Sequence, residues 1–131
     1  MQAGADRKLV LVVEDDPWTR TTEAALLAGE GYPVAEAKDG HEALRLAASL
    51  KPSVILLDLA LPTMSGLDVL RALRANPATR DIGVVIVSAY SSEVTDADAK
   101  LADARVSKPF GYDELVQQVD LAAGRQLAIA G

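Results

Sequence analysis

The stretch LVLVVEDDP, residues 9–17, decides the fold, because five apolar residues run directly into three carboxylates and a proline. A continuous β-branched run is typical of a strand that is buried on both faces of a parallel sheet. Two further runs have the same character, SVILLD at 53–58 and IGVVIVSA at 82–89. Each of the three runs leads to polar residues at or next to its end, Glu14, Asp58 and Ser88, so the chain predicts a sheet with a polar edge.

Weaker strands and helical segments fill the intervals between these runs. PVAEA (33–37) and RVS (105–107) are short strand candidates. The helical segments are 17–31, 41–50, 67–76, a poor one at 91–104, and 111–127. In the first of them, the helical spacing places Thr22, Leu26 and Gly29 on one face. Strict alternation of strand and helix predicts a single α/β domain, with a parallel sheet and helices on both faces.

Composition limits the classes of protein to which the chain can belong. Its 131 residues are enough for one domain, and the absence of cysteine excludes disulfides and thiolate metal sites. A net charge of −6 argues against a general nucleic-acid surface. The first seven residues contain no apolar segment of a secretory signal, and no run approaches the length of about 18 apolar residues expected of a membrane span. A cytoplasmic protein without a membrane partner is therefore expected.

Polar side chains follow four of the predicted strands. Glu14 and Asp15 follow the first strand, Asp58 the third, Ser88 the fourth and Lys108 the fifth. Ligands bind open parallel sheets at the carboxyl ends of the strands, so these side chains are expected to meet. Carboxylates held close together repel one another, and Mg²⁺ relieves that repulsion with oxygen ligands. A carboxylate beside the metal can attack phosphorus, while an ammonium and a hydroxyl bind the phosphoryl oxygens.

These motifs together resemble the receiver domain of two-component response regulators. The matching segments are VVED (12–15), LLDLALPTMSG (56–66), VSA (87–89) and KPF (108–110). The resemblance implies a flavodoxin-like, doubly wound sheet of five strands in the order 2-1-3-4-5, with about five helices. It also implies transfer of a phosphoryl group from a phosphohistidine to one aspartate, dependent on Mg²⁺ or Mn²⁺. The expected organisation is an extended or disordered tail (1–7), a receiver domain (8–123) and a helix end or tail (124–131).

The resemblance assigns roles to individual positions. The implied roles are phospho-acceptor for Asp58, metal ligands for Glu14, Asp15, Asp58 and the backbone carbonyl of Ala60, phosphoryl-binding groups for Lys108 and Ser88, a small residue for Ala89, and a cis bond before Pro109. Asp16 lies outside the acidic pair and is expected to cap the first helix. His41 is expected to be a solvated residue. Trp18, the only tryptophan, is expected to report metal binding by fluorescence.

One position departs from the family pattern. Three residues before the lysine of KPF, where the family usually has Tyr or Phe, this chain has Arg105. Because a guanidinium cannot fill an apolar slot unpaired, Arg105 is expected at the surface, paired with Asp103 or Asp113. The family's ring-rotation coupling would then be absent, and the signal would pass through the loop after Ser88, with Tyr90 as the moving aromatic. The poor helical segment before Arg105 is expected to be short, shifted or mobile.

The predicted function is a phosphorylation switch that is not an enzyme, apart from self-phosphorylation and slow self-dephosphorylation. Two alternatives remain: a pseudo-receiver that binds partners without being phosphorylated, and a phosphatase-like enzyme with an aspartyl phosphate intermediate. The expected donor is a sensor histidine kinase or a histidine phosphotransfer protein, the downstream protein target is unknown, and no direct contact with nucleic acid is expected. Whether the chain acts alone or as a fragment of a longer regulator is left open.

Overall fold

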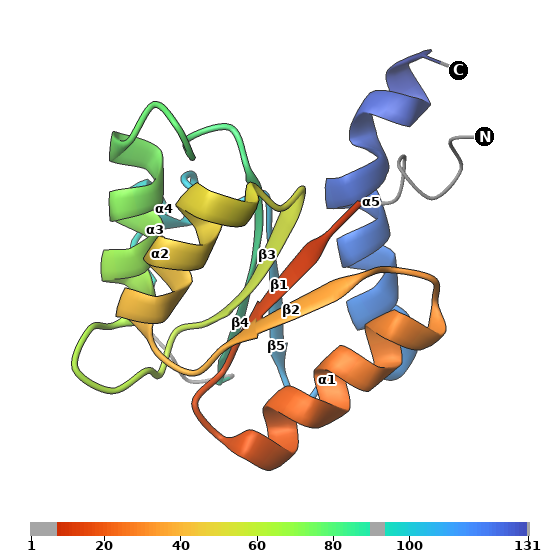
Figure 1. Cartoon of the computed structure of the whole chain (residues 1–131), viewed down its shortest axis with the longest axis horizontal. Helices are drawn as coiled ribbons and strands as arrows, with labels where there is room; N and C mark the ends of the chain where they lie inside the picture. Colours follow the sequence, from red (N-terminus) through yellow and green to blue (C-terminus); the bar gives the residue numbers. More distant parts are fainter. Residues whose placement is uncertain (1–7, 90–93, 131) are drawn as a thin grey trace.

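Five parallel strands form one sheet. The computed structural model describes residues 8–89 and 94–130, with side chains in the last helix as far as Ala123. The strand order is β2-β1-β3-β4-β5, which confirms the order that the resemblance implied (Figure 1). The strands are β1 (Val10–Val13), β2 (Val34–Ala37), β3 (Val54–Asp58), β4 (Gly83–Ala89) and β5 (Ala104–Lys108).

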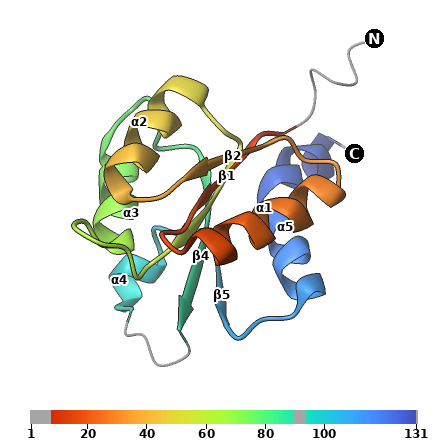
Figure 2. The same cartoon turned by 60° about the horizontal axis from the view of Figure 1, so that its bottom comes forward.

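Helices cover both faces of this sheet. They are α1 (Pro17–Gly29), α2 (Gly40–Leu50), α3 (Gly66–Ala75), α4 (Asp96–Ala99) and α5 (Tyr112–Ala130). Figures 1 and 2 show α1 and α5 together on one face, and α2, α3 and α4 on the other. This three-layer arrangement is the one that alternation of strands and helices predicted.

The apolar runs of the strands supply two separate core layers. Successive side chains of a strand point to opposite faces, so a run without polar residues feeds both layers. Val12 of β1 packs in the layer that contains Leu27 of α1 and Leu115 of α5. Its neighbour Val13 packs in the other layer, with Leu70 of α3. Because each such strand is buried on both faces, its apolar residues must stay within the sheet. The polar residues that follow them therefore lie at the strand ends.

The buried face of α1 differs from the predicted one. The spacing had placed Thr22, Leu26 and Gly29 on one face, but the buried side chains are Glu23, Ala24 and Leu27. Thr22 and Gly29 are exposed, and Leu26 is only partly buried. The helix has few large apolar residues, so a rotation of one position leaves its periodicity almost unchanged, and packing of Leu27 against the sheet decides the rotation.

The helix before β5 is a single turn, which confirms that this segment is short. Thr95 caps it by accepting a hydrogen bond from the Asp98 amide. Its sequence, DADA, has no large apolar residue with which to build a longer packed face. Tyr90 and its proposed movement lie outside the described residues, as does the predicted tail at 1–7.

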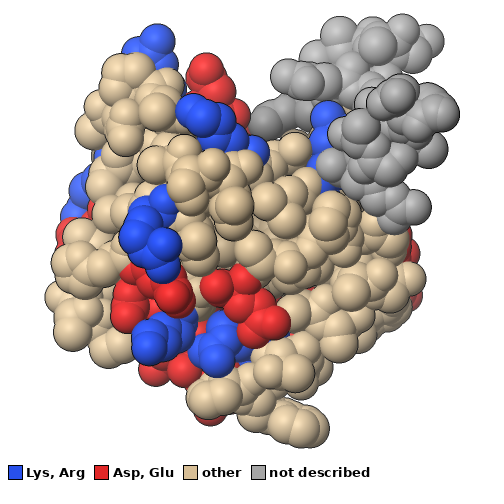
Figure 3. All heavy atoms as spheres, viewed as in Figure 1, with Lys and Arg blue, Asp and Glu red and all other residues tan. Residues whose placement is uncertain are grey.

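The described surface carries mixed charge. On the face shown in Figure 3, acidic and basic side chains lie next to one another and do not form a broad basic area. His41 is exposed, as expected. Among the helices that the structure describes, none is both long and apolar enough to cross a membrane.

Candidate functional site

Carboxyl groups from two strand ends meet at one edge of the sheet. Glu14 directly follows β1, and Asp58 is the last residue of β3. The two strands are neighbours in register, with Val13 opposite Leu57. Ligand oxygens of Glu14, Asp15 and Asp58 all lie within 4.8 Å of one another. The structure therefore brings together the three carboxylates that the sequence had singled out.

The loop between β1 and α1 is held by its own polar groups. Asp16 Oδ2 accepts a hydrogen bond from the Thr19 amide at 2.8 Å, which confirms Asp16 as the helix cap. This amide hydrogen bond lowers the pKa of the Asp16 carboxyl. The amide of Asp16 in turn donates to Glu14 Oε2 at 3.1 Å. The capping residue thus also holds Oε2 of Glu14 in place through its backbone amide.

Arg20 is a positioning residue that the sequence analysis missed. Its Nη1 donates to the backbone carbonyl of Glu14 at 3.0 Å and lies 3.5 Å from that of Asp15. Its Nε donates to Glu36 Oε1 on β2 at 3.1 Å. One guanidinium therefore ties the acidic loop to the edge strand of the sheet. Neither spacing nor composition distinguishes Arg20 from a solvated arginine on a helix.

The loop after β3 packs against the backbone of Asp58. The Ala60 amide donates to Asp58 Oδ1 at 3.1 Å, and the Gly66 amide donates to the Leu59 carbonyl at 2.9 Å. A Cβ added at Gly66 would lie 2.4 Å from the Asp58 carbonyl oxygen. Only glycine permits this approach, because real Cβ contacts are longer. Ala60 therefore fixes the side chain of Asp58, and the close approach of Gly66 fixes its backbone.

Burial and mutual repulsion dominate the electrostatics of the acidic residues. Glu14 is 3% exposed and Asp58 is 5% exposed, whereas Asp15 is open to solvent. Burial, together with the hydrogen bond and charge of Asp58, raises the pKa of Glu14 to about 7, against the smaller opposing effects of the Asp16 amide and Lys108. The described residues offer Glu14 Oε1 no hydrogen bond, although this oxygen is buried. Two buried carboxyl groups therefore compete for positive charge at this site.

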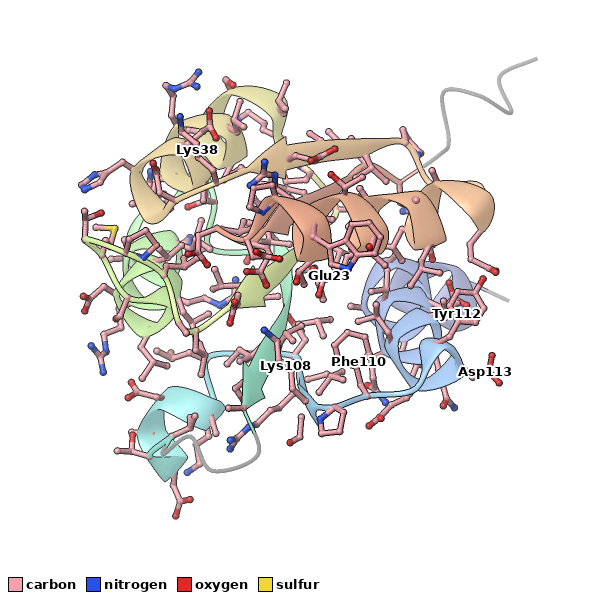
Figure 4. The ribbon with its side chains drawn as sticks, turned by 90° about the horizontal axis from the view of Figure 1, so that it is seen from below. Glu23, Lys38, Lys108, Phe110, Tyr112 and Asp113 are labelled. Atoms are coloured by element: carbon pink, nitrogen blue, oxygen red, sulfur yellow. The ribbon has the colours of Figure 1, made fainter. Side chains whose placement is uncertain are left out.

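Lys108 supplies one cation to this edge. Its Nζ lies 3.4 Å from Asp58 Oδ2 and 3.5 Å from Glu14 Oε1. Burial lowers the pKa of the ammonium, but the charges of Asp58, Glu14 and Glu23 and the hydrogen bond to Asp58 together outweigh that effect and raise it. Figure 4 shows Lys108 extending from the end of β5 toward α1. The Lys108–Pro109 peptide bond is cis, the isomer that the resemblance implied.

Glu23 is a second acidic residue that the sequence analysis missed. It lies on the inner face of α1, is 3% exposed, and its Oε2 has no hydrogen-bond partner among the described residues. Burial raises its pKa to about 7, with an opposing effect of Lys108 and a smaller additional effect of Asp58. Figure 4 shows it on the helix toward which Lys108 extends. The sequence contains one sign of this burial: Glu23 lies four residues before Leu27, and residues at this spacing share one face of a helix.

Arg105 contacts a hydroxyl group that the sequence did not suggest as its partner. Arg105 is exposed, as expected, but its Nε donates to the buried Ser88 Oγ at 2.9 Å. Asp103, one of the two expected partners, accepts from Arg74 at 3.3 Å and from the Val84 amide at 2.7 Å. The arginine is therefore connected to a predicted phosphoryl-binding residue.

The donor set fits a hard divalent cation. Three carboxylates offer closely spaced oxygens, and Glu14 Oε1 is buried without a hydrogen bond among the described residues. The pKa of Glu14 is raised mainly by burial and further by Asp58, and a bound cation would favour the ionised forms of both groups. Mg²⁺ prefers a few carboxylate ligands and retains several waters, which agrees with an acidic cluster that includes the exposed Asp15. Nitrogen and sulfur ligands are absent from this cluster, which disfavours softer metals.

Comparison with known proteins agrees with this geometry. The family model described as "Response regulator receiver domain" matches residues 10–120. The transcriptional regulatory protein KdpE of Mycobacterium tuberculosis is 41% identical over 122 residues, which cover 93% of this chain and 54% of that protein. The DNA-binding response regulator MtrA of Mycolicibacterium smegmatis is 42% identical over 118 residues, which cover 86% of this chain and 49% of that protein. The chain thus spans about half the length of these relatives.

Solved structures with the same fold include two that contain magnesium. The response regulator TrrA of Thermotoga maritima, in complex with Mg²⁺ and BeF, has a TM-score of 0.81 and 34% identity over 88% of this chain and 98% of its own. The receiver domain of a sensor histidine kinase from Pseudomonas aeruginosa has a magnesium ion coordinated in its active-site cleft. It has a TM-score of 0.81 and 28% identity over 90% of this chain and 98% of its own.

Proposed function

The chain belongs to the response regulator receiver domain family, and from this premise we propose that Asp58 accepts a phosphoryl group from a phosphohistidine. The resulting acyl phosphate would switch a surface that binds another protein. The observation that carries this proposal is the approach of Lys108 Nζ to 3.4 Å from Asp58 Oδ2, beside two further carboxylates. A nucleophilic carboxylate with an adjacent ammonium has both charges that phosphoryl transfer requires.

The side chains at this edge of the sheet supply the groups that the phosphoryl transfer needs. A carboxylate oxygen of Asp58 attacks phosphorus, the phosphorus–nitrogen bond of the donor breaks, and its electron pair stays on the imidazole nitrogen. The Lys108 ammonium binds one phosphoryl oxygen, and the Ser88 hydroxyl donates to another. Ala89, at the exposed end of β4, leaves room beside the incoming group. The Ala60 amide holds the acceptor carboxylate through its other oxygen.

The acidic residues are proposed to hold Mg²⁺ or Mn²⁺. Glu14, Asp15, Asp58 and the backbone carbonyl of Ala60 are the proposed ligands. When bound, the cation would neutralise the carboxylates and the charge of the phosphoryl oxygens. The buried, unsatisfied Glu14 Oε1 supports this assignment, since the described residues leave it without a hydrogen bond.

A switch fits this chain better than the two alternatives. Phosphatases with an aspartyl intermediate usually carry a second acid two residues after the nucleophile, whereas Asp58 is followed by Leu59 and Ala60. Without that acid, loss of the phosphoryl group would be slow self-hydrolysis. A pseudo-receiver usually lacks part of the constellation, whereas Glu14, Asp58 and Lys108 all meet here.

The proposed donor is a sensor histidine kinase or a histidine phosphotransfer protein, in the cytoplasm. The expectation of no nucleic-acid partner does not extend beyond this domain, because KdpE and MtrA are named a transcriptional regulator and a DNA-binding regulator. Since the chain covers about half of each, DNA binding through a further region is part of the proposal.

Incubation with acetyl phosphate and Mg²⁺ tests the assignment. Intact-mass spectrometry should show the mass of one added phosphoryl group, absent in Asp58→Asn and retained in the exposed control Asp81→Asn. A metal titration followed by fluorescence of Trp18, which is 79% exposed, should lose its response in Asp15→Ala. Unchanged phosphorylation of Asp58→Asn would refute the acceptor, and an unchanged titration of Asp15→Ala would refute the metal site.

A further inference from the structure

Ser88 and Arg105 lie on the same face of the sheet. On β4, Val84 and Ile86 belong to the core layer beneath α2 and α3, while Val85 and Val87 belong to the opposite layer. Alternation places Ser88 on the side of Ile86. On β5, Val106 belongs to the opposite layer, so its neighbour Arg105 also shares the side of Ile86.

The register makes the two residues diagonal neighbours. Ile86 is opposite Arg105, and Ser88 is opposite Ser107. A long side chain at Arg105 can therefore reach the serine two positions along the adjacent strand. The Nε–Oγ distance of 2.9 Å is that of a normal hydrogen bond. Arg105 is exposed and Ser88 is 1% exposed, so this bond connects the surface to a buried hydroxyl.

The chemistry of the pair fixes the direction of the hydrogen bond. A guanidinium only donates, whereas a hydroxyl has one proton and two lone pairs. Ser88 Oγ is therefore the acceptor from Arg105, and the serine proton remains available for another acceptor. A charged donor also polarises the hydroxyl and strengthens the bond that it gives in turn.

Asp58, the proposed phospho-acceptor, ends the strand next to that of Ser88. Asp58 is opposite Val87, so Ser88 is one residue beyond the aspartate on the neighbouring strand. We propose that Arg105 positions Ser88: its Nε–H holds the hydroxyl oxygen so that the hydroxyl proton points to a phosphoryl oxygen on Asp58. This inference rests on the proposed function and adds to it a residue that acts through another.

Arg105 and Lys108 thus serve the phosphoryl group by different routes. Lys108 Nζ contacts the Asp58 carboxylate at 3.4 Å, whereas Arg105 reaches this region through Ser88. Formation or loss of the phosphoryl group changes the strength of the bond that Arg105 gives, and Arg105 is at the surface of the edge strand β5. The signal therefore has a direct path to that surface, in addition to the route through the loop after Ser88 that the sequence led us to expect.

A double-mutant cycle tests the proposal on the complete 131-residue chain. The variants are Arg105→Ala, Ser88→Ala and the double variant, with Arg45→Ala as the control that removes a positive charge from exposed α2. The measurements are the affinity for beryllofluoride in the presence of saturating Mg²⁺, the affinity for Mg²⁺ alone, and the free energy of unfolding in urea. Arg105→Ala is expected to weaken beryllofluoride binding by about three- to tenfold, as for a charge-assisted hydrogen bond that is partly open to water.

The pattern across the variants distinguishes positioning from a general structural effect. Affinity for Mg²⁺ alone is expected to stay constant in Arg105→Ala, because the serine is not among the proposed ligands. In the Ser88→Ala background, the arginine substitution is expected to have no further effect on beryllofluoride affinity. Arg105→Lys, which keeps the charge and a donor, is expected to restore part of the loss. Arg45→Ala should match the parent chain.

Failure of this inference differs from failure of the proposed function. If the parent chain neither binds beryllofluoride nor gains a phosphoryl group from acetyl phosphate, the proposed function itself is wrong. If the parent chain binds and Arg105→Ala binds equally well, Arg105 does not position Ser88. An equal loss in the Ser88 and Ser88→Ala backgrounds, or a parallel loss of Mg²⁺ affinity, also overturns the inference.

Discussion

Glu14 Oε1 lies 3.5 Å from Lys108 Nζ, and within the described part of the chain this buried oxygen accepts no hydrogen bond. The same ammonium lies 3.4 Å from Asp58 Oδ2, so one cation is shared between two buried carboxyl groups. The site therefore has more carboxyl groups than cations. This favours function, because the binding of a cation or a phosphoryl group then changes the interactions of all these side chains. It is unfavourable for stability when neither is present.

Asp58→Asn is expected to stabilise the metal-free protein. The substitution removes a carboxylate that raises the pKa of Glu14, and the asparagine oxygen can still accept a hydrogen bond from the Ala60 amide. Lys108 then pairs with the charge of Glu14 alone. The expected gain in free energy of unfolding is about 1 kcal/mol in the presence of a chelator. Urea denaturation with and without Mg²⁺ measures it, and the parent chain should gain more from Mg²⁺ than the variant.

The exposed Asp81→Asn serves as the matched control, with an expected change of less than about 0.5 kcal/mol. A metal-free Asp58→Asn protein less stable than the parent chain would show that the pair with Lys108 outweighs the repulsion between the carboxyl groups.

Glu23 is expected to make the stability of the protein depend on pH. Its pKa is raised from 4.5 to about 7 in the folded state, so folding takes up a proton between these values. Stability therefore falls as the pH rises from about 4.5 to about 7, and the penalty remains above that range. Glu23→Gln removes the ionisation, so the variant should exceed the parent chain by on the order of 2 kcal/mol near pH 8 and by little near pH 5.

Urea denaturation of metal-free protein at both pH values measures this difference. The opposing charge of Lys108 and the additional charge of Asp58 are the same in parent and variant, so the difference isolates Glu23. Glu114→Gln, on the exposed surface of α5, is the control and should show no such pH dependence. A stability difference that is constant across the range would contradict the burial of an ionisable group at this position.

Much of the fold could be predicted because the strands of this chain are unambiguous. Continuous apolar runs identify β1, β3 and β4, and alternation with helices leaves few arrangements of the sheet. The candidate site followed from the same signal, since Asp58 and Lys108 close their strands and the carboxyl ends of parallel strands meet at one edge. The helix cap at Asp16 was also predictable, because aspartate is favoured at the residue before the first turn of a helix.

The missed features depend on contacts between distant segments. The rotation of α1, which buries Glu23, is decided by packing of Leu27 and not by the weak periodicity of the helix. The contact of Arg105 with Ser88 depends on the register of β4 and β5, which pairs Ile86 with the arginine. The spacing of residues in the sequence reveals neither the packing of Leu27 nor the register of β4 and β5. The partner expected for Arg105 was therefore an acidic residue nearby in the sequence.

Gly66→Ala is expected to disturb both stability and metal binding. The new Cβ would lie 2.4 Å from the Asp58 carbonyl oxygen and 2.5 Å from Leu59 Cα, and these backbone atoms cannot move without moving the acceptor. A loss of about 2 kcal/mol or more in free energy of unfolding is expected, together with weaker Mg²⁺ binding in the Trp18 fluorescence titration. Gly29→Ala, which meets no atom within 4 Å, should instead be neutral or stabilise by up to about 1 kcal/mol. An unaffected Gly66→Ala protein would show that the loop after β3 is not closely packed.

The single turn of α4 is expected to depend on one ion pair to α3. Arg71 Nε and Nη2 donate to the two carboxylate oxygens of Asp98, at 3.1 and 2.8 Å, and Asp98 is 8% exposed. The helix has no large apolar side chain, so this fork and the Thr95 cap are its main side-chain anchors among the described residues. Asp98→Asn should therefore increase amide hydrogen exchange across 96–102, where amides of this turn donate to the backbone carbonyls of Thr95, Asp96 and Asp98.

Asp96→Asn, at an exposed position of the same turn, is the matched control and should leave the exchange nearly unchanged. Arg71 lowers the pKa of Asp98, so the anchor is present above the ordinary pKa of an aspartate and is lost as the pH falls through the lowered value. Protection of the turn should consequently persist through mildly acidic solution and weaken at high salt, which screens the half-exposed Arg71. Equal exchange in Asp98→Asn and the parent chain would mean that backbone hydrogen bonds alone hold α4, and that the ion pair forms on a turn that is already stable.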